Sequence, residues 1–399
     1  MKSLYAEAGE PSLHLRRLRL SLNYYLKLRG HPENPAYECV MNPQLAEKYE
    51  AHPNSIPPLG IRLLPHLEGA GIDPERISES RLYTNADFWL LSNPTVRLDL
   101  TKYRKAETQP ALYLEALDQL IAEFSNYEQI FTDGSKAGDG VAAAAVSKSR
   151  LDRPLTTPLL GDSSVFTAEL QALLLSLNMV YQSKKSSFLI LSDSLSGLQA
   201  ISSRKLDHPL LVKIHDLHTR LIDEGRRIVF AWVPSHIGIH GNTVVDAIAK
   251  RTLQEPLPRG VRHSVPSSDF KEKTSKYVLK LWQSDWSQEN ENKLHKIRPS
   301  VSAPLYSGGR DRKEQTVLTR LRLGHTYVTH SHLLRGEEPP WCHACDQRYT
   351  VKHILIECSD LIDERKNFYS ALSLEEVFTN VAPSLVIAFL KHIRIFNRI

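Results

Sequence analysis

The sequence is short of the features that mark several broad classes of protein. Only 4 of its 399 residues are cysteines, which argues against a secreted fold held by disulfides. Its longest apolar stretch, residues 385–390, is soon interrupted by Lys391, His392 and Arg394 and is far shorter than the roughly 20 residues of a membrane-spanning helix. The N-terminus lacks the apolar core of a secretory signal. We therefore expect an intracellular protein, of the nucleus or the cytoplasm, with no membrane segment.

The composition excludes several further classes. Hydrophobic residues make up 41% and charged residues 24% of the chain, which is typical of globular protein and not of disordered, collagen-like or coiled-coil chains. A chain of 399 residues is too long for one ordinary compact unit and predicts two or three. The net charge of +5 is concentrated in the last third, which allows a polyanionic partner but does not require one.

Three regions differ in their sequence patterns. Residues 1–125 are rich in Pro and Leu, include a helical pattern at 12–28 and carry no catalytic motif, so we interpret them as a linker or docking region. Residues 126–254 alternate between strand and helix patterns. Residues 255–399 predict helices around 270–286 and 317–323 and then contain a cluster of cysteines at 342–358.

The middle region predicts an α/β fold. In chain order we expect strands at 129–132, 141–146 and 155–160, a helix at 164–181, a strand at 188–191, a short helix, a helix at 209–224, a strand at 228–233, and a helix at 242–253. Strands joined by helical crossovers are parallel. The order therefore predicts a mixed five-stranded sheet whose fourth and fifth strands are parallel to the first, with flanking helices on both faces.

Four carboxylates of this region stand at informative positions. We expect Asp133 at the end of the first strand, Asp193 at the end of the fourth, Glu169 in the first turns of the helix between them, and Asp246 one turn into the last helix. Each acid alone could be a helix cap or a turn residue. Strands one and four are neighbours in this sheet, and ligand sites form where parallel strands end, so we expect the acids to lie together. Clustered carboxylates repel one another unless a cation neutralises them, and hard oxygen ligands suit Mg²⁺ or Mn²⁺.

Five short motifs occur in order at family-like spacing. They are Thr132-Asp133-Gly134-Ser135, Ala168-Glu169-Leu170, Ser192-Asp193-Ser194, Trp232-Val233-Pro234-Ser235-His236 and Asn242-x-x-x-Asp246. With these motifs, residues 126–254 resemble ribonuclease H, and more closely the ribonuclease H domain of non-LTR retrotransposon reverse transcriptases.

The resemblance implies hydrolysis of the RNA strand of RNA·DNA hybrids. The four carboxylates would hold two Mg²⁺ ions, one activating the water and the other stabilising the leaving 3′-oxygen. His236 matches a mobile-loop histidine of the family that assists proton transfer or product release, and His240 is its rival in the same loop. Gly134 would let the backbone approach a phosphate or would serve only as a turn glycine, and Asn242 would cap the last helix.

One stretch departs from the family pattern. Cellular members often place amide side chains just before the helical glutamate, where they contact ribose 2′-hydroxyls, whereas residues 164–167 here are Ser, Val, Phe and Thr. The groups that recognise the RNA strand therefore stay open. We expect recognition through duplex shape and 2′-hydroxyls rather than through base sequence.

The cysteine cluster predicts a structural Zn²⁺ site. Cys342, Cys345, His353 and Cys358 lie within 17 residues and supply three thiolates and one imidazole, a closed tetrahedral set. Buried free thiols, a redox pair, or His343 as a competing ligand are the alternatives. Similar Cys/His segments follow ribonuclease H in the retroelement proteins that this chain resembles. Whether this segment also binds single-stranded nucleic acid, through residues such as Trp341, stays open.

The chain lacks a Tyr/Phe-x-Asp-Asp polymerase signature. It therefore resembles the part of a retroelement polyprotein that follows the polymerase, and we expect any reverse transcriptase partner to be supplied separately. A non-catalytic nucleic-acid-binding protein that retains the fold is the main alternative. A DNA-processing nuclease or integrase of related fold is disfavoured, because those enzymes generally lack this combination of helical Glu and late His loop.

Overall fold

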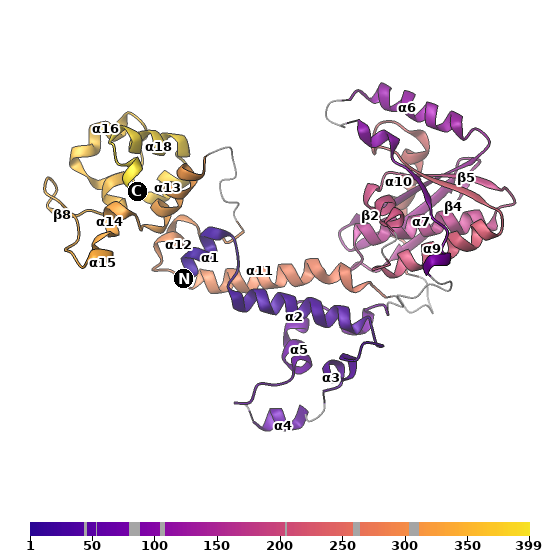
Figure 1. Ribbon diagram of the computed structural model, residues 1–399, viewed down its shortest axis with the longest axis horizontal. Coiled ribbons are helices and arrows are strands. Elements are labelled where there is room, and N and C mark those ends of the chain that lie inside the picture. The colour runs from indigo at the N-terminus through magenta and orange to yellow at the C-terminus, as the bar shows by residue number, and fades with distance from the viewer. Residues whose placement is uncertain are drawn as a thin grey trace. The chain divides into compact units, whose positions relative to one another are not determined.

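The computed structural model describes residues 1–43, 46–52, 54–79, 88–103, 108–203, 206–257, 264–302 and 311–399. It contains two compact units. One consists of Ser21–Thr274, and the other combines Met1–Leu20 with Ser275–Ile399. Figure 1 shows the strands and helices of each unit. Among the described residues, none of the helices has the length and apolar character needed to cross a membrane.

The unit Ser21–Thr274 contains a mixed sheet. Its strands are β1 (Thr95–Arg97), β2 (Glu128–Ala137), β3 (Gly140–Ser147), β4 (Arg150–Leu159), β5 (Ser187–Ser192) and β6 (Arg227–Trp232). Its helices are α3 (Tyr37–Met41), α4 (Ala46–Ala51), α5 (Leu59–Gly69), α6 (Pro110–Glu123), α7 (Val165–Gln182), α8 (Leu195–Ser202), α9 (Pro209–Asp223) and α10 (His240–Thr252). Two further helices, α2 (Leu13–Arg29) and α11 (Lys271–Ser287), contain the boundaries between the two units.

The sheet confirms the predicted α/β fold and adds one strand to it. The strand order is β1-β6-β5-β2-β3-β4. The first four strands in this order are parallel to one another, while β3 is antiparallel to both β2 and β4. The sheet therefore has six described strands, not five, because Thr95–Arg97 from the N-terminal region pairs with β6. A strand of three residues is too short to show an alternating pattern in the sequence.

Alternate residues of the strands build two cores, one on each face of the sheet. On one face Ile130, Phe188 and Ile190 pack against α7, α8 and α9. On the other face Phe131, Leu189 and Leu191 pack against α6 and α10. This alternation follows from the two-residue period of a strand, and it produces three layers, helices on sheet on helices (Figure 1).

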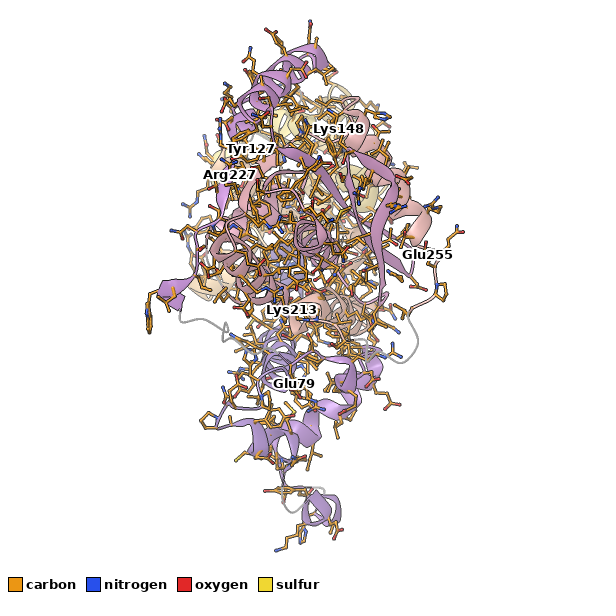
Figure 2. The ribbon with its side chains drawn as sticks, turned by 90° about the vertical axis from the view of Figure 1, so that its right-hand side faces the viewer. Glu79, Tyr127, Lys148, Lys213, Arg227 and Glu255 are labelled. Carbon is orange, nitrogen blue, oxygen red and sulfur yellow. The ribbon has the colours of Figure 1, made fainter. Side chains whose placement is uncertain are left out.

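The two ends of the parallel strands differ in chemistry. At the amino ends of β2 and β6, the guanidinium of Arg227 lies over the ring of Tyr127, 5.9 Å from its centroid (Figure 2). At the carboxyl end of β5, the chain passes directly into Asp193. The acidic residues singled out by the sequence motifs belong to this second end.

The other unit is helical and includes the N-terminal helix. Its elements are α1 (Lys2–Ala8), α12 (Lys293–Ile297), α13 (Arg312–Leu323), α14 (Tyr327–His330), α15 (His332–Arg335), β7 (Trp341–Cys342), β8 (Gln347–Arg348), the π-helix η5 (His353–Glu357), α16 (Ile362–Lys366), α17 (Leu374–Thr379) and α18 (Pro383–His392). Helix α1 is anchored by Glu7, whose carboxylate forms a buried ion pair with Arg322 of α13. A buried charge needs such a partner, so α1 is an integral part of this unit.

Candidate active site and metal centre

The end of the parallel pairing brings two aspartates side by side. The parallel register of β2 with β5 ends at Thr132 opposite Ser192, so the next residues of the two chains, Asp133 and Asp193, are neighbours. The prediction from the sequence that Asp133 ends its strand is wrong. Strand β2 continues to Ala137 because β3 still pairs with it beyond the end of β5.

Helix α7 carries the third acid to the same place. Ser164 caps the helix by accepting a hydrogen bond from the Thr167 amide at 3.1 Å, and the apolar residues that follow bury the helix against the sheet. Gly134 makes the close approach possible, because a Cβ there would lie 2.5 Å from the backbone nitrogen of Glu169. The glycine of the first motif thus serves contact between strand and helix.

The three acids form one compact group. Asp133, Glu169 and Asp193 each offer a carboxylate oxygen, and these atoms all lie within 4.8 Å of one another. Burial, and then the charges of Asp193 and Asp246, raise the pKa of Asp133 to about 7. Burial, and then Asp133 and Asp193, raise the pKa of Glu169 to about 9. The pKa of Asp193 is also raised, mainly by burial.

Two polar atoms at this cluster have no hydrogen-bond partner among the described residues. They are Oε2 of Glu169 and Oδ1 of Asn242, both buried. Buried polar atoms are nearly always satisfied, and buried carboxylates that raise one another's pKa favour a cation between them. The donor set consists of hard oxygens, which suits Mg²⁺ or Mn²⁺. The residues present therefore fit a divalent metal site.

Asn242 is a site residue whose role the sequence missed. We expected it to cap the last helix, but α10 begins earlier, at His240. Asn242 instead lies inside the first turn, and its Nδ2 donates a hydrogen bond to Oδ2 of Asp193 at 3.3 Å. This bond lowers the pKa of Asp193 and partly offsets the effect of burial. The signal available in the sequence was the spacing of four residues between Asn242 and Asp246, which places both on one helix face.

Asp246 stands apart from the other three acids. It is not in the group of three whose ligand atoms lie within 4.8 Å, and its Oδ2 accepts a hydrogen bond from Lys250 at 2.8 Å. It is close enough for its charge to raise the pKa of both Asp133 and Asp193. The structure thus brings three of the four predicted acids together and holds the fourth beside them in an ion pair.

His236 lies in the exposed loop between β6 and α10. It has a φ of 57°, a left-handed conformation that is uncommon for residues other than glycine. The charge of its ring lowers the pKa of Asp193, so the ring is close enough to influence the acidic cluster. Its rival His240 is the first residue of α10 and is exposed.

Strands β2 to β6, the acidic group and helix α10 all lie within one segment of the chain. Residues 125–254 match the family model of RNase H. The chain therefore carries an RNase H domain, which supports a nuclease that acts on nucleic acid. No curated protein matches the chain.

A second group of metal-ligand side chains lies outside the RNase H domain. Cys342, Cys345, His353 and Cys358 each offer one ligand atom, and these atoms all lie within 4.8 Å of one another. The sulfurs of Cys342 and Cys345 are each 3.9 Å from the sulfur of Cys358. Four ligands placed tetrahedrally around Zn²⁺, with bonds of about 2.3 Å, would separate two sulfurs by about 3.8 Å.

The surroundings of this second group also fit a metal. Both ring nitrogens of His353 are buried and have no hydrogen-bond partner among the described residues. The Ser359 amide donates to Cys345 Sγ at 3.3 Å, and its hydroxyl lies 3.0 Å from the same sulfur. Such bonds favour the thiolate and lower the pKa of Cys345. His343 is exposed and is not a member of the group.

Proposed function

We propose that the RNase H domain hydrolyses the RNA strand of RNA·DNA hybrids with the help of two divalent cations. Asp133, Glu169 and Asp193 would hold Mg²⁺, or Mn²⁺ in its place, and Asp246 would complete the set. The observation that carries the proposal is the group of three carboxylates, Asp133 buried and the other two half-buried, with ligand atoms within 4.8 Å of one another and with raised pKa values.

The cations would supply positive charge for the attacking and leaving oxygens of the phosphodiester. The protein's own residues hold the cluster in shape. The backbone of Gly134 hydrogen-bonds to the Glu169 carboxylate, which favours its charged form. Asn242 does the same for Asp193 and orients it. His236 lies near Asp193 in an exposed loop, and it would accept or donate a proton as substrate enters or product leaves.

Asp246 would bind a cation only by giving up its ion pair with Lys250. In the structure the ammonium of Lys250 neutralises Asp246, and 25% of the Asp246 side chain is exposed. An ion pair whose ammonium is exposed contributes little to stability, because solvent screens it. A cation would therefore compete readily with Lys250 for this carboxylate.

We infer that Cys342, Cys345, His353 and Cys358 hold a structural Zn²⁺ ion. All four ligand positions would be filled by protein atoms, which is typical of structural sites and leaves no position for a substrate. Together with the five motifs of the RNase H domain, this segment supports an origin in a non-LTR retroelement. Trp341, which is half exposed, and the basic residues Arg348 and Lys352 support contact with single-stranded nucleic acid.

The test is cleavage of a labelled RNA·DNA hybrid by the purified full chain in Mg²⁺, beside single-stranded RNA, duplex RNA and duplex DNA. We expect cleavage of the hybrid only, with 5′-phosphate and 3′-hydroxyl products. Asp133→Asn should abolish it, and Asp118→Asn, a matched change at an exposed residue of α6, should not. Binding of the hybrid without cleavage in Mg²⁺ or Mn²⁺ would show a non-catalytic binding protein instead.

A further inference from the structure

The first turn of α7 is bonded to a carboxylate that lies beyond the segment matched by the RNase H family. Asp269 belongs to the 3₁₀ helix η4 (Ser267–Phe270), while the match ends at residue 254. Its Oδ2 accepts hydrogen bonds from the Ser164 amide at 2.9 Å and from the Thr167 hydroxyl at 2.6 Å. Its Oδ1 accepts one from the Ser164 hydroxyl at 3.0 Å. One carboxylate therefore ties both ends of this turn.

A buried histidine extends the same network. The Thr167 hydroxyl lies 3.1 Å from Nε2 of His208, and both residues are buried. Nδ1 of His208 accepts a hydrogen bond from the Leu210 amide at the start of α9. In the neutral ring Nε2 then carries the proton and donates to Thr167, whose own proton goes to Asp269. The N-termini of α7 and α9 are thus linked to each other and to Asp269.

This arrangement has a clear energetic basis. The first amides of a helix have no partner within the helix, and a negative charge near them is favourable because the helix dipole is positive at this end. Asp269 supplies that charge from another part of the chain. A second tether nearby is Lys273, which forms an ion pair with Asp162 at 2.5 Å and donates a hydrogen bond to the Gly71 carbonyl at 3.0 Å. Neither interaction involves Ser164, Thr167 or Asp269.

The first turn of α7 determines where Glu169 lies. Glu169 follows Thr167 by two residues, and the backbone of Ala168 and Glu169 packs directly on Gly134. A small rotation or fraying of this turn would move the carboxylate away from Asp133 and Asp193. Residues 164–167 are also the stretch in which this sequence departs from the pattern of cellular ribonuclease H proteins. Here the Ser and Thr hydroxyls are engaged with Asp269.

We propose that Asp269 is a positioning residue for Glu169, acting through the capped first turn of α7, so that the acidic site depends on a residue beyond the RNase H match. The proposal rests on the proposed function. Ser164 and Thr167 then belong to an internal hydrogen-bond network. Contact with the RNA strand is made by other groups.

The kinetic test uses the full chain and a hybrid substrate. Asp269→Ala should lower kcat by about 10–100-fold and raise the Mg²⁺ concentration that gives half the maximal rate. Losses of this size are typical when a residue that supports a metal ligand is removed. The KM for the hybrid should stay unchanged. Asp269→Asn, which keeps one acceptor oxygen, should show a smaller loss of kcat than Asp269→Ala. Lys273→Met is the matched control, because it weakens the docking of the same segment but leaves the cap intact.

Hydrogen exchange gives a readout that does not need cleavage. The amides of residues 164–169 should exchange about tenfold faster or more in Asp269→Ala than in the wild type, and at the wild-type rate in Lys273→Met. If the wild type cleaves no hybrid, the proposed function fails while this measurement still decides whether Asp269 fixes the turn. Unchanged exchange and unchanged kcat in Asp269→Ala would overturn the proposal, and so would an equal loss of kcat in Lys273→Met.

Discussion

The two groups of metal-ligand side chains are built in opposite ways. The acidic group takes its members from β2, α7 and the end of β5, which the fold brings together. The Cys/His group lies within 17 consecutive residues, around two strands of two residues each and the short π-helix η5 that contains His353. A cluster assembled by a complete sheet exists before any ion binds, whereas ligands carried on short elements within 17 residues depend more on their ion for shape. Loss of metal should therefore affect activity at the first group and folding at the second.

The largest expected effect is at the Cys/His group. Structural Zn²⁺ contributes about 10–16 kcal/mol in small zinc domains, so Cys358→Ser should remove the ion and unfold the segment around residues 342–358. Zinc content by elemental analysis and limited proteolysis of the full chain would measure this. His343→Ala should keep the ion, since His343 is exposed and outside the group. Full zinc retention in Cys358→Ser would contradict the assigned ligand set.

The acidic group should destabilise the metal-free protein at high pH. Asp133 and Glu169 have native pKa values of about 7 and about 9, above their unfolded values, so the native state binds more protons. The contribution of these two carboxyls to the free energy of unfolding is therefore greatest below about pH 4 and falls as the pH rises to about 9. Asp133 alone accounts for at most about 4 kcal/mol of this fall.

Thermal unfolding in a chelator, from pH 5 to pH 9, would measure this loss. Mg²⁺ should restore stability at pH 8. Asp133→Asn should reduce both the loss of stability at high pH and the gain in stability that Mg²⁺ causes. Because chelation also removes Zn²⁺, the series should be repeated on Cys358→Ser. A melting temperature that does not depend on pH or Mg²⁺ in either background would show that the acids are neutralised by other means.

A smaller effect is expected from the loop before α10. His236→Ala should lower kcat by about 10²-fold, the lower end of the range for proton transfer by a side chain. His240→Ala is the matched control and should keep the wild-type rate. Steady-state rates over pH 5–9 would distinguish the two histidines. The reverse result, with loss only in His240→Ala, would reassign the role to the residue that begins the helix.

The smallest predicted effect is on packing. Gly134→Ala would place a methyl group 2.5 Å from the backbone nitrogen of Glu169, and α7 would have to move away from β2. Such overpacking costs about 1–3 kcal/mol, which denaturant unfolding would detect. Gly138→Ala, at a turn glycine with open space around it but a φ of 57°, is a control for backbone strain alone. Equal losses in the two variants would argue against a close strand and helix contact.

The sequence predicted the sheet and the location of the acids because both leave strong local patterns. Buried strands such as β5 are continuous apolar runs, and Asp193 directly follows one. The features that it missed depend on partners distant in the chain. Strand β2 is prolonged by β3, β1 pairs with β6, and Asp269 bonds to α7 across more than a hundred residues. No periodicity within a segment reports such contacts.

The position of Asp246 illustrates the same limit. It lies near Asp133 and Asp193 as expected. Its ion pair with Lys250, one turn further along α10, could have been read from the spacing of i and i+4. The sequence alone gave no reason to choose between that partner and a shared cation, since both neutralise a carboxylate.

We propose that three carboxylates assembled by the fold make the RNase H domain a metal-dependent nuclease for hybrids. The most direct test is the single-turnover rate of hybrid cleavage by the wild type, Asp193→Asn and Asp118→Asn as Mg²⁺ is titrated. We predict a rate that saturates with Mg²⁺, a loss of about 10³-fold or more in Asp193→Asn, equal to about 4 kcal/mol, and no change in Asp118→Asn. Cleavage by Asp193→Asn at the wild-type rate, or a wild-type rate that does not depend on Mg²⁺, would contradict this proposal.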